Sequence, residues 1–266
     1  MKKWLKRLAY TLGIIYLALC VALYFGQERL LFHPRIHDAA YSYGSYPEQW
    51  VGGTPGDRLH ALHLRARPDR NAEKVVLYLH GNVGDNGRGL YQTKQLQDLG
   101  YDMYLADYPG FGKSERKLND ESDLTEAMQA AYDRLKKSYG ESNIILLGYS
   151  LGSGPVSYLM ANNEPAGAVL VAPYRSLTAM KNLWFWMFPD FILKYELNNQ
   201  ANLAEATSPT ILLHGTEDPL IPYAMSEELR AVAPERIELK KLQGVTHRGA
   251  IFRPEVKAAV QQLANR

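Results

Sequence analysis

A serine between two glycines stands where an apolar segment of the chain ends. The segment NIILLGY is typical of a buried strand, and the motif Gly148-x-Ser150-x-Gly152 overlaps its end. A sharp strand-to-helix turn at such a motif strains the backbone of its central residue and exposes the side chain. The flanking residues must be small, because the helix packs closely against the strand. The pattern therefore predicts that Ser150 is a nucleophile.

A serine hydroxyl needs a neighbouring base that removes its proton. Two later loops offer suitable groups, because TEDPLIP contains Asp218 and GVTHRGA contains His247. The order Ser150, Asp218, His247 is the one expected with this turn. His247 would take the serine proton and pass it to the leaving group, and Asp218 would orient the imidazole and stabilise its charged form. Glu217 is the alternative carboxylate.

Two backbone N–H groups are expected to bind the negative charge that develops on the substrate oxygen. One is the amide of Leu151, directly after the nucleophile, and the other is the amide of Asn82, in the HGN turn after the strand-like KVVLYL. Loss of one such donor typically lowers the rate by about 10²–10³. Because these donors belong to the main chain, a side-chain substitution at Asn82 tests the role poorly.

Strand-like and helix-like segments alternate along the chain, which predicts an α/β fold with a mostly parallel central sheet and helices on both faces. In such sheets ligands bind at the carboxyl ends of the strands, where the loops discussed above would lie. Strands are expected within residues 59–66, 74–82, 101–114, 143–149, 167–173, 209–215 and 236–242, and helices at 123–138, 151–162, 222–232 and 254–264.

Residues 174–207 interrupt this alternation after the sixth strand, and we expect them to form a small helical insertion that covers the site like a cap. They contain the aromatic run NLWFWMFPDFIL. Three interpretations of the aromatic segment 183–193 stay open: it packs on the sheet, it lines a pocket for an acyl chain, or it touches lipid.

The N-terminal segment predicts a membrane anchor. Residues 8–25 carry no charge, and as a helix they would extend about 27 Å, enough to cross a bilayer core. Three other interpretations fit the segment less well. A cleaved signal peptide would need a shorter apolar region and a small-x-small site, and a lipoprotein signal would need a small residue before Cys20; the segment has none of these features. A buried amphipathic helix would show a polar face, which is also missing. Four Lys or Arg precede the run, so the positive-inside rule predicts a cytoplasmic N-terminus and a periplasmic or exoplasmic domain.

Composition restricts the possible partners and chemistry. The net charge is +2, and the four basic residues before the apolar run leave a near-neutral domain. Such a domain lacks the positive field that nucleic-acid binding needs. Cys20 is the single cysteine, so an intramolecular disulfide and a cysteine-rich metal site are both excluded. We expect no metal and no organic cofactor.

Other titratable residues are expected to have structural roles. His80 and His214 each precede a glycine at the end of a strand. His60 and His63 lie three apart on a predicted strand and would point to opposite faces, so they cannot easily share a metal. Asp107 follows a strand and is expected to support the main chain of its loop rather than to act as a second acid.

Five motifs occur in the order found in the α/β-hydrolase superfamily: HGN, DYPGFGKS, GYSLGS, HGTEDPLIP and THRG. Within it, the chain resembles the membrane-anchored α/β-hydrolase-domain proteins related to serine aminopeptidases and monoacylglycerol lipases. The resemblance covers roughly residue 58 to the C-terminus and implies an α/β-hydrolase fold and hydrolysis of esters, thioesters or amides through an acyl-enzyme. The HGN turn departs from the HGGG type of many lipases.

Together these observations predict a serine hydrolase that cleaves a carboxylic ester or thioester, with a small acyl ester, a lipid or an acylated protein as substrate. The alternatives are an aminopeptidase-type amide hydrolase, with Glu196 or Asp190 as possible amine-binding acids, and a non-catalytic binding protein on the same scaffold. We expect an anchor at 1–30, a linker and first edge strand at 31–57, and the hydrolase domain at 58–266.

Overall fold

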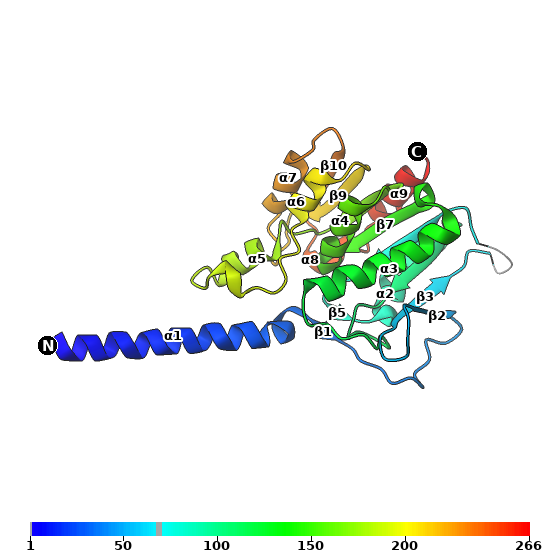
Figure 1. Cartoon of the computed structure of the whole chain (residues 1–266). Helices are drawn as coiled ribbons and strands as arrows, with labels where there is room; N and C mark the ends of the chain where they lie inside the picture. Colours follow the sequence, from blue (N-terminus) through cyan, green and yellow to red (C-terminus); the bar gives the residue numbers. More distant parts are fainter. Residues whose placement is uncertain (1, 68–70) are drawn as a thin grey trace.

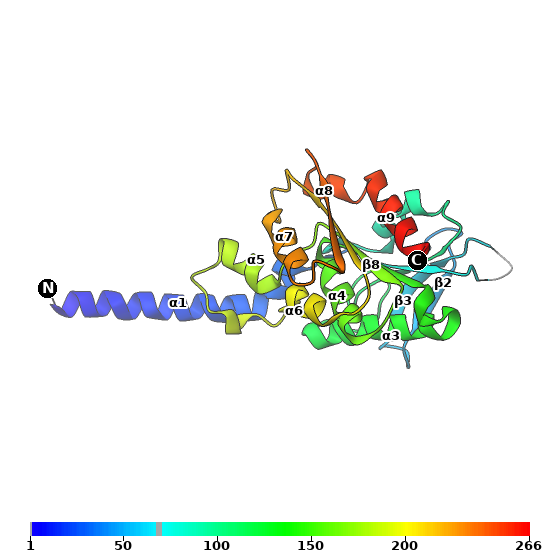
Figure 2. The same cartoon turned by 90° about the horizontal axis from the view of Figure 1, so that it is seen from above.

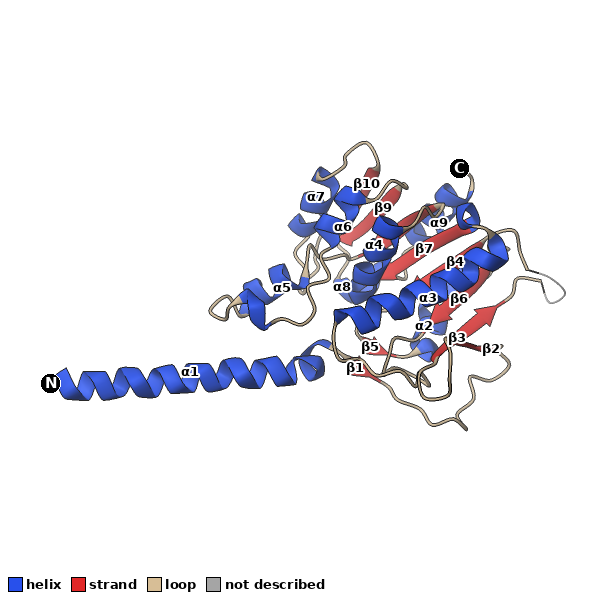
Figure 3. Ribbon diagram, in the orientation of Figure 1, coloured by secondary structure: helices blue, strands red, loops and turns tan. Residues whose placement is uncertain are grey.

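A computed structural model describes residues 2–67 and 71–266 of the chain. Its centre is an eight-stranded sheet with the strand order β10-β9-β8-β7-β4-β6-β3-β2 (Figure 3). Neighbouring strands are parallel except that β3 is antiparallel to both β6 and β2. The strands are β2 (Glu48–Val51), β3 (Leu59–Leu64), β4 (Val75–Leu79), β6 (Asp102–Ala106), β7 (Ile144–Tyr149), β8 (Gly167–Val171), β9 (Thr210–Gly215) and β10 (Ile237–Leu242).

Helices cover both faces of this sheet, as Figure 2 shows from above. The packing on one face involves α3, α4, α6 and α7, and that on the other involves α2, α8 and α9. The helices of the chain are α1 (Lys2–Leu31), α2 (Asn86–Gln92), α3 (Glu121–Tyr139), α4 (Ser153–Asn162), α5 (Leu177–Trp184), α6 (Asn199–Glu205), α7 (Ala224–Ala231), α8 (His247–Ala250) and α9 (Pro254–Ala264).

The central strands are apolar along their whole length because both of their faces are covered, and β7 is an example. All its residues are buried, and successive side chains point to opposite faces. Ile144 and Leu146 therefore join the core under α3 and α4, whereas Ile145 and Leu147 join the core under α9. A strand covered on both faces cannot alternate between apolar and polar residues.

The expected α/β fold is confirmed, including the insertion after the sixth strand of the large sheet. Strand β10 lies at one edge of the sheet, and β2 forms the other. Helix α2 was not expected from the sequence, and neither were the two-residue strands β1 (His33–Pro34) and β5 (Val83–Gly84), which pair with each other. Elements this short carry no clear periodicity.

The insertion divides into two parts. Helix α6 packs against α4 and belongs to the main helix layer. The preceding residues, 177–193, which we call the cap, contain α5 and the short 3-10 helix Asp190–Ile192 and extend away from the sheet (Figure 1).

Helix α1 projects from the domain and lies beside the cap along its C-terminal part (Figures 1 and 2). Among the described residues it is the helix whose length and composition would allow it to cross a membrane. Its C-terminal end is fixed to the domain, because Phe32 is buried and packs edge-on against Phe111 and Tyr195.

Candidate active site

The turn at Ser150 has the strained geometry that its motif predicts. Ser150 has a φ of 52° at the end of β7, in the left-handed region that disfavours side chains. A Cβ on Gly148 would come within 2.7 Å of the Gly152 carbonyl oxygen, and one on Gly152 would collide with the carbonyl oxygen of Leu79. The two glycines are therefore required because the chain after Ser150 returns directly onto β7 and β4.

The structure brings the three residues Ser150, His247 and Asp218 together at the carboxyl ends of the strands. Nε2 of His247 lies 3.0 Å from Oγ of Ser150, and Nδ1 lies 2.7 Å from Oδ2 of Asp218. His247 is the first residue of α8, and Asp218 lies in the loop after β9. The imidazole thus has one nitrogen for the hydroxyl and the other for the carboxylate.

Asp218 is held in its charged form by surrounding donors. Its Oδ1 accepts hydrogen bonds from the amides of Leu220 and Ile221, both at 2.9 Å. Burial would raise the pKa of Asp218, but hydrogen bonds from His214, His247 and the Ile221 amide hold this pKa well below its usual range. The alternative acid, Glu217, is exposed to solvent.

His214 has a larger part in the site than its position before a glycine suggested. It is fully buried, with Nε2 3.0 Å from the Ile221 carbonyl oxygen and 3.3 Å from Oδ2 of Asp218, and with Nδ1 2.6 Å from Oγ of Ser226. It therefore fixes the loop that carries the acid. The only sequence feature that could have indicated this contact is the spacing of four residues between His214 and Asp218. Outside a helix, such a spacing does not predict that two side chains meet.

Asn82 and Leu151 both line the cavity beside Ser150. The Asn82 amide N–H has no hydrogen-bond acceptor among the described residues, so it remains available to a ligand. The Asn82 side chain donates to the carbonyl oxygen of Leu31, the last residue of α1, at 3.1 Å. The turn is further held by the hydroxyl of Tyr108, which donates to the carbonyl oxygen of His80 at 2.5 Å.

The side chain of Asp107 supports the main chain at the start of α2, whereas the sequence predicted that it would support its own loop. Its Oδ1 accepts from the amide of Asn86 at 2.7 Å, and its Oδ2 lies 3.3 Å from His60. Burial would raise the pKa of Asp107, but the hydrogen bond with His60 and the nearby imidazole of His80, 3.6 Å away, lower it. His63 has different partners, with Nε2 2.7 Å from the hydroxyl of Tyr139. In the part of the chain that the structure describes, no three His, Cys, Asp or Glu residues form a group that could hold a metal.

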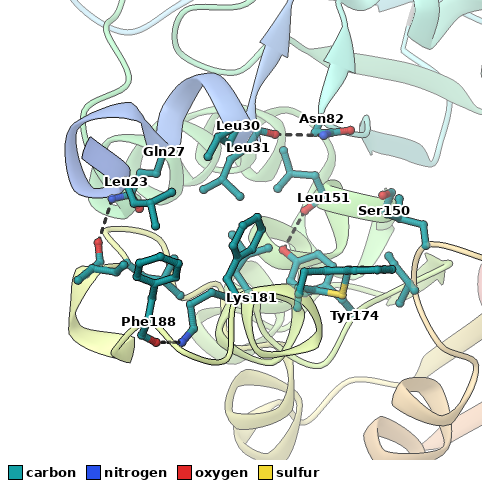
Figure 4. Close-up of a pocket in the computed structure, with 18 residues that line it drawn as sticks. Leu23, Gln27, Leu30, Leu31, Asn82, Ser150, Leu151, Tyr174, Lys181 and Phe188 are labelled. Atoms are coloured by element: carbon teal, nitrogen blue, oxygen red, sulfur yellow. Dashed lines mark hydrogen bonds between the residues drawn. The ribbon is translucent and has the colours of Figure 1, made fainter. Parts of the chain in front are cut away.

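A cavity of about 300 Å³ opens at Ser150 and extends between α1 and the cap (Figure 4). Its walls are mainly apolar. Three aromatic side chains of the run contribute to it, namely Trp184, Phe185 and Phe188, whereas Trp186 and Phe191 do not. Helix α1 contributes Leu23, Gln27, Leu30 and Leu31.

Comparison with known families identifies the class of protein that this fold and site define. Residues 70–203, half of the chain, match the family described as serine aminopeptidase, S33. The chain therefore belongs to this family of α/β-hydrolases.

Two relatives among characterised proteins are similar over much of the chain. Human alpha/beta hydrolase domain-containing protein 17B is 28% identical over 198 residues, which are 72% of this chain and 66% of that protein. The lysophosphatidylserine lipase ABHD12 of Macaca fascicularis is 25% identical over 184 residues, 61% of this chain and 46% of that protein. The chain thus spans about half to two thirds of the length of these relatives.

Solved structures share the fold at low sequence identity. The esterase Pf2001 of Pyrococcus furiosus has a TM-score of 0.69 at 19% identity and covers 89% of this chain and 98% of its own. Est1E of Butyrivibrio proteoclasticus has a TM-score of 0.66 at 16% identity and covers 82% and 99%. These similarities support the α/β-hydrolase fold.

The close packing at the serine turn predicts a stability cost for Gly152→Ala. The new methyl group would collide with main-chain atoms of Leu79 and His80, which cannot rotate away, so the free energy of unfolding should fall by about 1–3 kcal/mol or more. Gly53→Ala is the matched control, because a Cβ there meets nothing within 4 Å. Urea denaturation of both variants measures the difference, and equal midpoints would contradict the packing argument.

Proposed function

We propose that this protein is a serine hydrolase that cleaves a carboxylic ester or thioester through an acyl-enzyme, with Ser150, His247 and Asp218 as its catalytic triad. The observation that carries the proposal is the imidazole of His247, whose two nitrogens face the Ser150 hydroxyl and the Asp218 carboxylate at hydrogen-bonding distance. Membership of the serine aminopeptidase, S33, family and the similarity to a lysophosphatidylserine lipase support it.

In the first half-reaction, Oγ of Ser150 attacks the carbonyl carbon while Nε2 of His247 takes the hydroxyl proton. The resulting oxyanion receives hydrogen bonds from the amides of Leu151 and Asn82. The bond to the leaving group then breaks, and His247 gives its proton to the departing alcohol or thiol. The ionised Asp218 stabilises the imidazolium throughout, and its lowered pKa means that it stays charged in this role.

In the second half-reaction water replaces the leaving group. Nε2 of His247 takes one proton from the water, the hydroxide adds to the acyl carbon, and the bond to Oγ breaks. The proton returns to Ser150 and the carboxylic acid is released. No group beyond the chain and water is required for this sequence.

The cavity favours an acyl chain over a charged amine. None of the described residues that line it is acidic, whereas an aminopeptidase needs an acid for the substrate's free amine. Asp190 is paired with Lys181 at 2.6 Å, and Glu196 is exposed. A purely binding role does not explain why a hydroxyl, an imidazole and a carboxylate are aligned.

We further propose that α1 anchors the protein in a membrane with its N-terminus in the cytoplasm and the hydrolase domain, residues 58–266, on the periplasmic or exoplasmic side. The uncharged run 8–25 and the basic residues before it support this orientation.

The nucleophile is tested by Ser150→Ala. This change should abolish labelling by a fluorophosphonate probe and lower turnover of p-nitrophenyl esters by up to about 10⁶-fold, because the triad acts as a unit. Ser138→Ala, at an exposed position of α3, is the control and should leave both probe labelling and ester turnover unchanged. Undiminished labelling of the Ser150→Ala variant would refute the assignment.

The acyl pocket is tested by chain length. Phe188→Ala removes an aromatic ring from the cavity wall. It should reduce kcat/KM for long-chain p-nitrophenyl esters more than for the acetate ester, because we expect only a long chain to reach Phe188. Trp184→Ala should act in the same direction. Phe252→Ala, outside the cavity, is the control, and equal losses for all chain lengths would count against an acyl pocket.

The orientation is tested by protease accessibility. In bacterial spheroplasts with an intact inner membrane, added protease should digest the domain and leave an N-terminal tag protected. A cytoplasmic marker protein should stay intact in the same sample. Digestion of the domain only after full lysis would reverse the proposed topology.

A further inference from the structure

Five apolar side chains of the cap are exposed, and we call these residues, Trp184, Phe185, Trp186, Met187 and Phe191, the cap tip. Trp186 is 73% exposed and Phe191 84% exposed. A contiguous exposed group of aromatic residues is unusual on a soluble surface and marks contact with a membrane or a partner. Of these residues only Trp184 and Phe185 line the cavity, so the cavity does not account for the others.

The position of the cap tip along α1 indicates which contact it makes. The hydroxyl of Tyr16 donates to the carbonyl oxygen of Met187 at 2.8 Å, and the Tyr16 ring stacks on Phe188 with centroids 5.7 Å apart. Tyr16 lies in the middle of the uncharged run, nine residues before Phe25 at its end. Nine residues correspond to about 14 Å along a helix. If α1 crosses a bilayer along this run, the part of the cap tip around Met187 lies at a similar depth, whereas Phe191, next to Ile192 in the sequence, lies nearer the polar end.

The base of the cap is fixed at the polar end of the same helix. Gln27 is the buried residue of α1, and its Nε2 donates to the carbonyl oxygen of Ile192 at 3.0 Å. Its Oε1 accepts from the amide of Lys194 at 2.8 Å, and Nζ of Lys194 pairs with Glu28 at 2.7 Å. Charged and polar groups thus meet at the end of the uncharged run, where a membrane surface would lie.

The distribution of charge along the cap agrees with this position relative to a membrane. Residues 184–189 carry no charge. Asp190 is the one acid near the tip, and its carboxylate is paired with Nζ of Lys181 at 2.6 Å. Asp190 is also only two residues from Ile192, which Gln27 holds at the polar end of the run. No unpaired charge of the described cap therefore opposes contact with lipid.

We propose that the cap tip is immersed in the lipid bilayer beside α1, and that the acyl chain of the substrate enters the cavity from the lipid between α1 and the cap. Leu23 and Leu30 of the helix face Phe188 of the cap across this cavity, which ends at Ser150 (Figure 4). The route of the acyl chain rests on the proposed hydrolase activity, whereas the immersion rests on the proposed membrane anchoring by α1, together with the exposed apolar surface and its position along that helix. The substrate class is accordingly a membrane-resident acyl ester whose chain stays in an apolar environment as it reaches the serine.

Immersion is tested by fluorescence quenching in the full-length chain reconstituted in vesicles of phosphatidylcholine brominated on its acyl chains. One variant keeps only Trp186 (Trp4→Phe, Trp50→Phe, Trp184→Phe), and its control keeps only Trp50, on β2 (Trp4→Phe, Trp184→Phe, Trp186→Phe). Trp186 should emit at shorter wavelength and lose most of its emission relative to unbrominated vesicles, whereas Trp50 should not be quenched. Equal quenching of the two would overturn the proposal. Blue-shifted but unquenched Trp186 would overturn it in favour of a protein partner or a second copy.

The route is tested with Trp186→Ser combined with Phe191→Ser, since neither residue lines the cavity. Hydrolysis of a long-chain ester embedded in vesicles should fall by about tenfold or more, because membrane contact scales with buried apolar area. Hydrolysis of dissolved p-nitrophenyl butyrate should stay unchanged. The control changes another exposed aromatic pair, Tyr91→Ser and Phe252→Ser, and should leave both rates unchanged. An equal loss of activity toward both substrates in the cap variant would contradict the proposed route.

The two proposals fail in distinguishable ways. If the protein is not a serine hydrolase, the fluorophosphonate probe leaves it unlabelled while the quenching of Trp186 is still observed, including in a Ser150→Ala background. If the cap tip is not immersed, the probe still labels Ser150 while Trp186 behaves like Trp50.

Discussion

The contact between the chain at Gly152 and the carboxyl end of β4 constrains most of the site. Because no side chain at Gly152 can be accommodated next to the Leu79 carbonyl group, α4 begins directly against the sheet. This closeness holds Ser150 in its left-handed conformation, and Leu151 and Asn82 line the same cavity as Ser150. The conformation of the proposed nucleophile thus depends on one packing contact. Such strain persists only where the surrounding structure overdetermines it.

Two buried carboxylates in this protein are each surrounded by two histidines, with different consequences. Asp107 lies with His60 and His80 inside the domain and holds the main chain at the first residue of α2. Asp218 lies with His214 and His247, and the other ring nitrogens of these imidazoles face the hydroxyls of Ser226 and Ser150, respectively. In both cases hydrogen bonds outweigh burial and lower the pKa of the acid. What distinguishes the proposed catalytic group is that Ser150, beyond His247, lines the cavity, whereas Ser226, beyond His214, is fully buried and does not.

Helix α1 combines two properties that are usually found in separate elements. Its uncharged run has the length and composition of a membrane anchor, and its C-terminal residues form one wall of the cavity that ends at Ser150. The Asn82 side chain also binds the end of α1, so the loop with a proposed oxyanion donor is fixed to the same helix. Helix α1, the cavity and the proposed catalytic centre are therefore one structural unit, and the proposed access to lipid depends on this arrangement.

The sequence by itself determined the order and type of the long elements, since an apolar run such as β7 and the regular apolar spacing of α3 are local signals. It also indicated Ser150, Asp218 and His247, because a strand-to-helix motif and the loops after later strands of a parallel sheet meet at one edge. The short pair β1 and β5, the packing of α6 on α4 and the contact of His214 with Asp218 were decided only by the tertiary structure. The same holds for Gln27 and Tyr16, whose partners in the cap are more than 160 residues away in the sequence. Local periodicity reports which face of an element is buried, but contacts between distant segments depend on how complete elements pack.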